Sequence, residues 1–148
     1  CKMEESIKIE EAIAKALKLE AVDPRTYSPL VLAYIGDAVY ELLIRTKVIN
    51  HGSMQVNKMH KKSASLVKAE TQANIIKAIQ EDLTEEELAV YKRGRNAKSA
   101  TTAKHATMID YRMATGFEAL VGYLYLQARH DRLLELIQDG LEKIGELS

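Results

Sequence analysis

The sequence is poor in cysteine and proline and has no long apolar run. Its 148 residues include one cysteine, Cys1, and two prolines, Pro24 and Pro29. One cysteine cannot form an internal disulfide, which agrees with a reducing cytoplasm. No stretch is long and apolar enough to cross a bilayer, and residues 1–11 carry charges where a secretory signal would need an apolar core. We therefore expect a soluble, cytoplasmic protein.

The net charge is also zero, so the total charge indicates no nucleic-acid partner. The distribution of the charges is more informative. Residues 91–105 contain five Lys or Arg and no acid, and residues 51–69 contain four lysines and no acid, while acids gather at residues 81–87. Such a separation can present a basic face to phosphates. The alternative is that these runs are only solvated helix faces.

Apolar periodicity predicts helices along nearly the whole chain. Ser28 before Pro29 favours a helix start, and Thr84 with Glu87 is typical of a capping box. No alternating strand pattern occurs. We expect an all-α fold of about six to seven helices, with a helical extension and linker over residues 1–27 and one domain over residues 28–148. The expected helices cover residues 4–19, 29–49, 53–80, 84–94, 107–130 and 131–144.

Two of these helices are apolar nearly all round but carry an acid beside small residues. Asp37 follows Gly36 in VLAYIGDAVYELLIR, and Glu118 precedes Ala119 in TGFEALVGYLYLQAR. A buried carboxylate without a partner is costly, and neither acid has a basic residue four positions further on. If the two helices pack together, both carboxylates can coordinate one divalent cation, with water completing its shell. The small residues would leave room for the ion and for a substrate backbone.

A purely structural interpretation of these acids stays open. Asp37 could bond a nearby backbone end or pair with an arginine such as Arg112, and Glu118 could be a partly exposed helix residue. Glu41 lies about 40° round the helix from Asp37, so it could join the same site or face solvent.

The histidines and helical tyrosines receive simpler interpretations. The four histidines lack the spacing of metal ligands, so we expect no zinc site. Four tyrosines in apolar helices are expected in the core or in a dimer interface rather than as platforms for base stacking. They are Tyr34, Tyr40, Tyr123 and Tyr125.

The sequences that flank the two acids resemble a known family. AYIGDAVYELLIR at residues 33–45 resembles the signature helix of the ribonuclease III family, and HKKSA at residues 60–64 accompanies it. RGRNAKS followed by YRMATGFEALVGYLYL resembles the short form of that family, Mini-ribonuclease III, more closely than the long enzymes. The stretches stand in the family's order, and the resemblance extends from about Pro29 to the last helix.

The resemblance implies an all-α endonuclease domain that works as a homodimer and cleaves double-stranded RNA with Mg²⁺. It implies that Asp37 and Glu118 are catalytic and bind the metal, and that cleavage leaves a 5′-phosphate and a 3′-hydroxyl. It also implies a role in maturing ribosomal RNA, with the 23S precursor as the expected substrate. A ribosomal protein is a further candidate partner.

This chain departs from the long enzymes at the metal site. They carry further carboxylates where this chain has Leu30, Ala33 and Thr115. We therefore expect more of the metal shell to come from water and RNA phosphate, which suits Mg²⁺. The main rival hypothesis is a non-catalytic RNA-binding or ribosome-assembly factor that kept the helical dimer, and a helical protein-interaction module is the third.

No double-stranded-RNA-binding domain follows in this sequence, so we expect the domain itself to hold the RNA through phosphate contacts. Arg93 and Gly94 could instead be the end and cap of a helix, whereas Arg95 and Lys98 would lie beyond that end. The expected RNA-binding residues are Arg93, Arg95, Asn96 and Lys98 in the loop RGRNAK, and His60, Lys61 and Lys62 in a second group.

Overall fold

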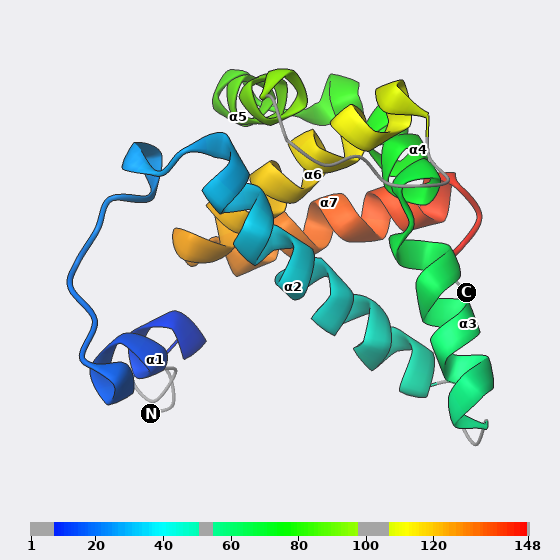
Figure 1. Cartoon of the computed structure of the whole chain (residues 1–148), viewed down its shortest axis with the longest axis horizontal. Helices are drawn as coiled ribbons and strands as arrows, with labels where there is room; N and C mark the ends of the chain where they lie inside the picture. The colour runs from blue at the N-terminus through cyan, green and yellow to red at the C-terminus, as the bar shows by residue number, and fades with distance from the viewer. Residues whose placement is uncertain (1–7, 51–54, 98–106, 148) are drawn as a thin grey trace.

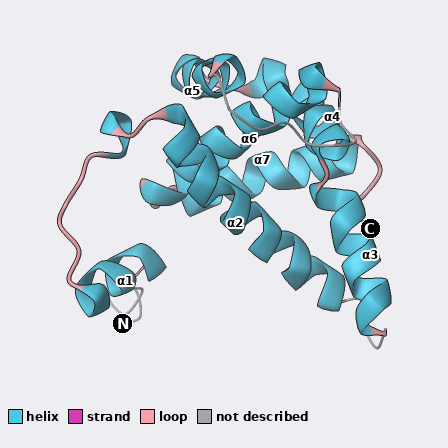
Figure 2. Cartoon of the chain, viewed as in Figure 1, coloured by secondary structure: helices cyan, strands magenta, loops and turns pink. Residues whose placement is uncertain are grey.

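The computed structural model describes residues 8–50, 55–97 and 107–147, which form helices joined by short connections (Figures 1 and 2). No strand occurs in these three ranges, so the prediction of an all-α fold is confirmed. None of the helices in them is long and apolar enough to cross a membrane. The helices are α1 (Ile9–Leu17), α2 (Pro29–Ile49), α3 (Val56–Val67), α4 (Ala69–Ile79), α5 (Glu85–Asn96), α6 (Met108–Leu126) and α7 (His130–Lys143), with 3-10 turns η2 (Pro24–Thr26) and η3 (Gln80–Asp82).

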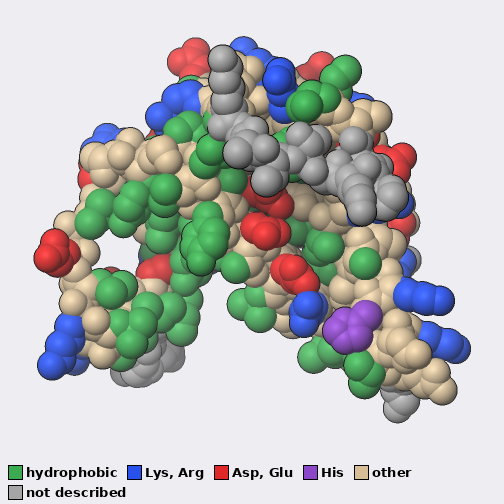
Figure 3. Space-filling model, viewed as in Figure 1, with side chains coloured by type: hydrophobic (Ala, Val, Ile, Leu, Met, Phe, Trp, Pro, Cys, Tyr) green, Lys and Arg blue, Asp and Glu red, His purple; other side chains and the backbone are tan. Residues whose placement is uncertain are grey.

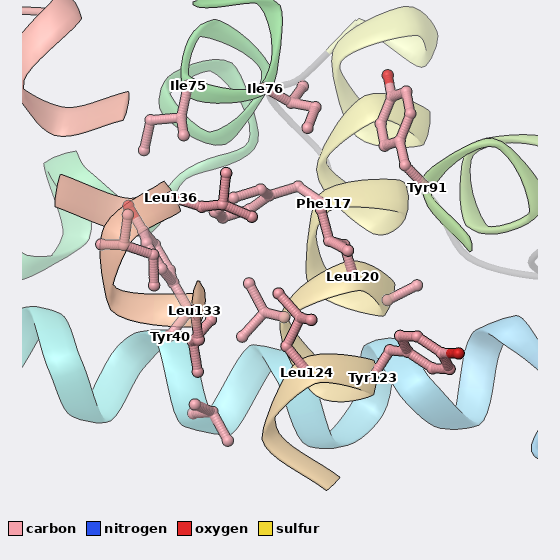
Figure 4. Packing of buried hydrophobic residues seen from close by; sticks show 14 of the residues in the cluster. Tyr40, Ile75, Ile76, Tyr91, Phe117, Leu120, Tyr123, Leu124, Leu133 and Leu136 are labelled. Atoms are coloured by element: carbon pink, nitrogen blue, oxygen red, sulfur yellow. The ribbon is translucent and has the colours of Figure 1, made fainter. Parts of the chain in front are cut away.

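Helix α6 lies at the centre of the fold. Helices α2, α4, α5 and α7 all pack against it, and every residue from Ala114 to Leu124 except Glu118 is buried. Figure 4 shows side chains of α2, α4 and α7 converging on Phe117, Leu120 and Leu124. The Tyr40 ring meets the Phe117 ring edge to face at 5.3 Å. Glu118 therefore lies within the buried stretch of α6, among mostly apolar neighbours.

Two glycines bring α2 and α6 into direct backbone contact. A Cβ atom on Gly36 would lie 1.8 Å from the carbonyl oxygen of Glu118, and one on Gly122 would lie 2.0 Å from that of Leu32. No larger residue fits at either position unless the helices move apart. Gly36 thus serves the helix crossing, and the expectation that the small residues beside the acids leave room for an ion and a substrate backbone stays a prediction.

The helix expected over residues 53–80 is wrong as a single element. The backbone is extended at Lys68 (φ −68°, ψ 159°), so α3 ends at Val67 and α4 begins at Ala69. Two side chains of α4 hold the break: Thr71 Oγ1 donates to the carbonyl of Ser65 at 2.6 Å, and Gln72 Nε2 donates to that of Val67 at 2.7 Å. The predicted start at Ser53 lies outside the described residues.

The predicted helix starts at Ser28 and Thr84 are confirmed by their caps. Ser28 Oγ accepts the N–H of Val31 at 3.3 Å, and Thr84 and Glu87 form the reciprocal capping box. The end predicted near Gly94 lies two residues further on, at Asn96. Gly94 is buried inside α5, where an added Cβ would lie 2.8 Å from that of Ala119 on α6. It does not cap the helix.

The N-terminal helix α1 is attached to the domain by few contacts. None of its residues is buried, and Figure 1 shows it set apart from α2 by the connection that includes η2. Glu10 Oε2 lies 2.5 Å from His130 Nε2, and Lys8 Nζ donates to the carbonyl oxygen of Ala128 at 3.2 Å. The division of the chain at residues 27 and 28 stays a prediction.

Candidate active site

The crossing of α2 and α6 brings Asp37 and Glu118 together. Because Gly36 packs on the carbonyl of Glu118, the next residue of α2 places its carboxylate beside that of Glu118. Burial, followed by the neighbouring charge of Asp37, raises the pKa of Glu118 to about 8. Asp37 itself is exposed, whereas Glu118 is only partly exposed. The expectation that the two helices pack and that their acids meet agrees with this geometry.

A cation would stabilise the ionised forms of the two adjacent carboxylates. Like charges at close range disfavour ionisation of both groups, and a cation between them removes that penalty. Figure 3 shows acidic side chains gathered in the middle of one face, with basic side chains and one histidine next to them toward α3. The site is therefore open to solvent on the Asp37 side and walled by the helix crossing on the Glu118 side.

The donor set fits a hard cation that keeps much of its water. Within the described ranges, no three residues among His, Cys, Asp and Glu come together as metal ligands. Mg²⁺ is commonly bound by one or two carboxylates together with water and substrate phosphates. Thr115, whose hydroxyl donates to the carbonyl of Tyr111 at 3.0 Å, and Ala33, which is buried, supply no carboxylate to this site.

The hydrogen bonds and ion pairs near the site decide between the alternatives left open for Glu41 and Asp37. Glu41 accepts two hydrogen bonds from Arg45, at 3.0 Å from Nε and 2.6 Å from Nη2. It therefore forms an ion pair along α2 and is not a free third carboxylate. Asp37 and Arg112 both lie in the described part of the chain, and no ion pair joins them. The structural alternative proposed for Asp37 is not the arrangement found.

Sequence reasoning missed Gln72, which touches Glu118. Gln72 Nε2 donates to Glu118 Oε2 at 3.2 Å as well as to the carbonyl of Val67. This bond lowers the pKa of Glu118 and so opposes the larger effects of burial and Asp37. The available signal was the position of Gln72 on the apolar stripe of α4, one helical turn before Ile75 and Ile76, where a polar side chain is unusual.

The expected RNA-binding residues lie in two separate places. His60, Lys61 and Lys62 are exposed on α3, with Lys62 Nζ 3.1 Å from Glu146 Oε1. The other group lies at the end of helix α5 rather than in a loop, and Figure 1 shows α5 well apart from α3. Lys98 lies outside the described residues.

Within the α5 group, Arg93 and Asn96 are exposed. The Arg95 guanidinium carbon lies 5.7 Å from the centre of the Tyr91 ring, and its Nε donates to Asn96 Oδ1 at 3.2 Å. Arg95 is therefore oriented by its neighbours, while its remaining N–H groups can meet an anion.

This fold and this pair of acids define the class of protein. The Ribonuclease III domain family matches residues 30–129, a range that contains both acids and the helices that carry them. The chain belongs to the ribonuclease III family. This assigns it as a ribonuclease of the endonucleolytic class, from a family that acts on double-stranded RNA and typically works as a dimer.

The similar proteins belong to the short form of the ribonuclease III family. The chain is 55% identical over 117 residues to the Mini-ribonuclease 3 of Clostridium tetani, covering 78% of each sequence. It is 47% identical over 126 residues to the Mini-ribonuclease 3 of Enterococcus faecalis, covering 84% of this chain and 96% of that protein. The resemblance to Mini-ribonuclease III is confirmed.

A solved structure supports the fold. The crystal structure of a Fusobacterium nucleatum protein superposes with a TM-score of 0.74 at 34% identity, covering 80% of this chain and 96% of that one. The predicted domain type, an all-α ribonuclease III endonuclease domain, is therefore confirmed.

Proposed function

We propose that this chain is a Mg²⁺-dependent endoribonuclease that cleaves double-stranded RNA, with Asp37 and Glu118 as the catalytic, metal-binding residues. The observation that carries the proposal is the meeting of the two carboxylates at the α2 and α6 crossing, where burial and then the charge of Asp37 raise the pKa of Glu118 to about 8. Two neighbouring acids without a basic partner are stable in their ionised forms only when a cation joins them.

The two acids have different roles at the site. Glu118 is anchored by Gln72 and fixed by the buried helix around it, so it sets the position of the site. Asp37 is exposed and is accessible to a substrate. When bound, Mg²⁺ polarises the scissile phosphate and offsets the charge that develops on it. Hydrolysis then leaves a 5′-phosphate and a 3′-hydroxyl.

The RNA is held by phosphate contacts from basic and polar side chains on α3 and α5. His60 and Lys61 on α3, and Arg93, Arg95 and Asn96 on α5, have donors that can reach a phosphate backbone. Lys62, whose side chain remains partly available beside Glu146, and Lys98 complete the proposed set. Contacts of this kind follow the shape of an A-form helix rather than its sequence.

The proposed assembly is a homodimer formed through the exposed apolar side of α2. Tyr34 is 82% exposed and Leu42 is 65% exposed, and Val31 adds to the same helix. Large apolar side chains gathered on one helix are typical of a protein interface. Tyr34 lies three residues before Asp37, so a two-fold interface there would place a second copy beside each site. Tyr40 and Tyr123, in contrast, belong to the core.

The proposed substrate is the 23S ribosomal RNA precursor in the cytoplasm, and a ribosomal protein is the proposed additional partner. These assignments are supported by the resemblance to Mini-ribonuclease III. The geometry supports them only by accessibility, since Asp37 and most of the proposed RNA contacts on α3 and α5 lie at the surface.

Cleavage of a duplex fragment of 23S precursor RNA tests this proposal. Wild-type protein with Mg²⁺ is compared with wild-type protein in EDTA and with Asp37→Asn and Glu118→Gln. We expect discrete products from the wild type that disappear in EDTA and in both variants. Asp37 is exposed and makes no ion pair in the described structure, so its substitution should leave folding intact. Full activity of Asp37→Asn would refute the site, and RNA that binds but stays whole throughout would favour the non-catalytic factor.

A further inference from the structure

Gln72 is a polar side chain in the apolar layer between α4 and α6. It is 2% exposed, and it lies on the same face of α4 as Ile75, Ile76 and Ile79, which are completely buried. An apolar residue would pack in such a place without leaving polar atoms to satisfy. A glutamine here therefore has a reason beyond filling space.

The two hydrogen bonds of Gln72 fix the orientation of its amide. The carbonyl of Val67 and Oε2 of Glu118 are both acceptors, at 2.7 Å and 3.2 Å. Only the amide nitrogen can face them, because the amide oxygen has no proton to donate. The oxygen, Oε1, therefore points away from both acceptors, and within the described residues no group donates to this buried atom. Buried acceptors without a donor are rare, so the atom requires a partner.

A neutral amide is well suited to hold a metal ligand. A lysine or arginine at this position would neutralise Glu118 and compete with a cation for its charge. An apolar side chain would leave Glu118 without a partner on the α4 side. The amide donates one hydrogen bond to one carboxylate oxygen and leaves the net charge of the Asp37 and Glu118 pair unchanged.

We propose that Gln72 is a positioning residue of the metal site. Its Nε2 holds Glu118 Oε2 so that the carboxylate stays turned toward Asp37, and its Oε1, on the other side of the amide, accepts a hydrogen bond from a buried water. This inference rests on the proposed function, because it assumes that Asp37 and Glu118 bind the metal. It also links the metal site to the break between α3 and α4, because the same amide nitrogen donates to the carbonyl of Val67 at the end of α3.

Metal binding without RNA tests the role of Gln72 separately from catalysis. The full chain is titrated with Mn²⁺ by calorimetry, and unfolding of each variant is followed by circular dichroism. Gln72→Met keeps the length and removes both polar atoms. We expect the dissociation constant for Mn²⁺ to rise about 10- to 100-fold, as is usual when a hydrogen-bond partner of a metal ligand is removed.

Thr71→Val is the matched control. Thr71 is also buried on α4, and its hydroxyl bonds the carbonyl of Ser65 across the same break, but no hydrogen bond joins it to Glu118. Both variants should lose stability, while Thr71→Val should keep the dissociation constant for Mn²⁺ within about twofold of the wild type. An unchanged dissociation constant in Gln72→Met would mean that Gln72 only braces the break, and the inference would fall.

Two further variants keep the outcomes distinct. If Gln72→Met does not fold, Gln72→Asn is titrated instead: its amide is one methylene too short to hold Glu118 Oε2, so Mn²⁺ binding should weaken as for Gln72→Met, and unchanged binding would overturn the inference. Asp37→Asn should abolish binding. If Asp37→Asn binds Mn²⁺ like the wild type, the proposed metal site itself is wrong, a failure different from that of Gln72 alone.

Discussion

Replacing Glu118 by glutamine should stabilise the metal-free protein at high pH. The pKa of Glu118 is raised from 4.5 in the unfolded chain to about 8 in the folded protein. Below pH 4.5 both states hold the proton, and the group costs nothing. As the pH rises from about 4.5 to about 8, the unfolded state loses its proton first, so the folded state loses stability relative to it. Above about pH 8 the full penalty is present.

The size of this penalty follows from the shift. A pKa change over that interval corresponds to at most about 5 kcal/mol, and solvent at the partly exposed carboxyl screens it to about 2 kcal/mol. Glutamine has no charge to lose. For a domain of this size, Glu118→Gln should therefore raise the melting temperature by about 6 °C at pH 8.5 in EDTA. At pH 4.5 the two proteins should melt within about 1 °C of each other.

Thermal melts in EDTA from pH 4.5 to 9 provide the assay. Glu20→Gln is the control, because Glu20 is exposed, lies outside the helices and forms no ion pair in the described structure, and its melting temperature should follow the wild type at every pH. Parallel curves for wild type and Glu118→Gln across the whole range would refute the reasoning that burial and Asp37 destabilise the ionised Glu118. Added Mg²⁺ should restore the wild type at pH 8.5 and leave Glu118→Gln unchanged.

Two further predictions concern the helix crossing and the apolar face of α2. Gly36→Ala should lower the free energy of unfolding in urea by about 3 kcal/mol, because the new methyl group would meet the backbone of Glu118. Asn57→Ala on the exposed side of α3 is the control. A stabilised Gly36→Ala would show that the helices can separate freely. Tyr34→Glu should convert a dimer to a monomer in sedimentation velocity, since it places charges in the proposed interface; a variant that sediments as a dimer like the wild type would exclude Tyr34 from that interface.

Sequence patterns predicted the helices whose apolar residues recur with helical periodicity. Helix α2 begins and ends where expected, because Ser28 and Pro29 mark its start and its apolar residues continue to Ile49. The meeting of Asp37 and Glu118 is a contact between helices, and it was predicted because acids in otherwise apolar helices need partners and because their flanking sequences resemble the ribonuclease III family. Helix starts and apolar periodicity are encoded locally, so one sequence suffices to find them.

The features that were missed depend on contacts between elements. Apolar periodicity shows which residues face the core but not where the backbone changes direction, so the break at Lys68 was invisible. The break is what allows Gln72 to reach both the end of α3 and Glu118. The alternative that Gly94 caps a helix stayed open for the same reason, because its close approach to Ala119 is a tertiary contact.

The backbone contact between α2 and α6 has a consequence for how the site tolerates change. Side chains throughout the core can be exchanged for others of similar volume while the two helices keep their separation, because that separation is limited by main-chain atoms at Gly36 and Gly122. The spacing of the two carboxylates is therefore decoupled from the identity of most core residues. Such a chain can therefore change many of its core residues and still hold the two carboxylates at the same spacing.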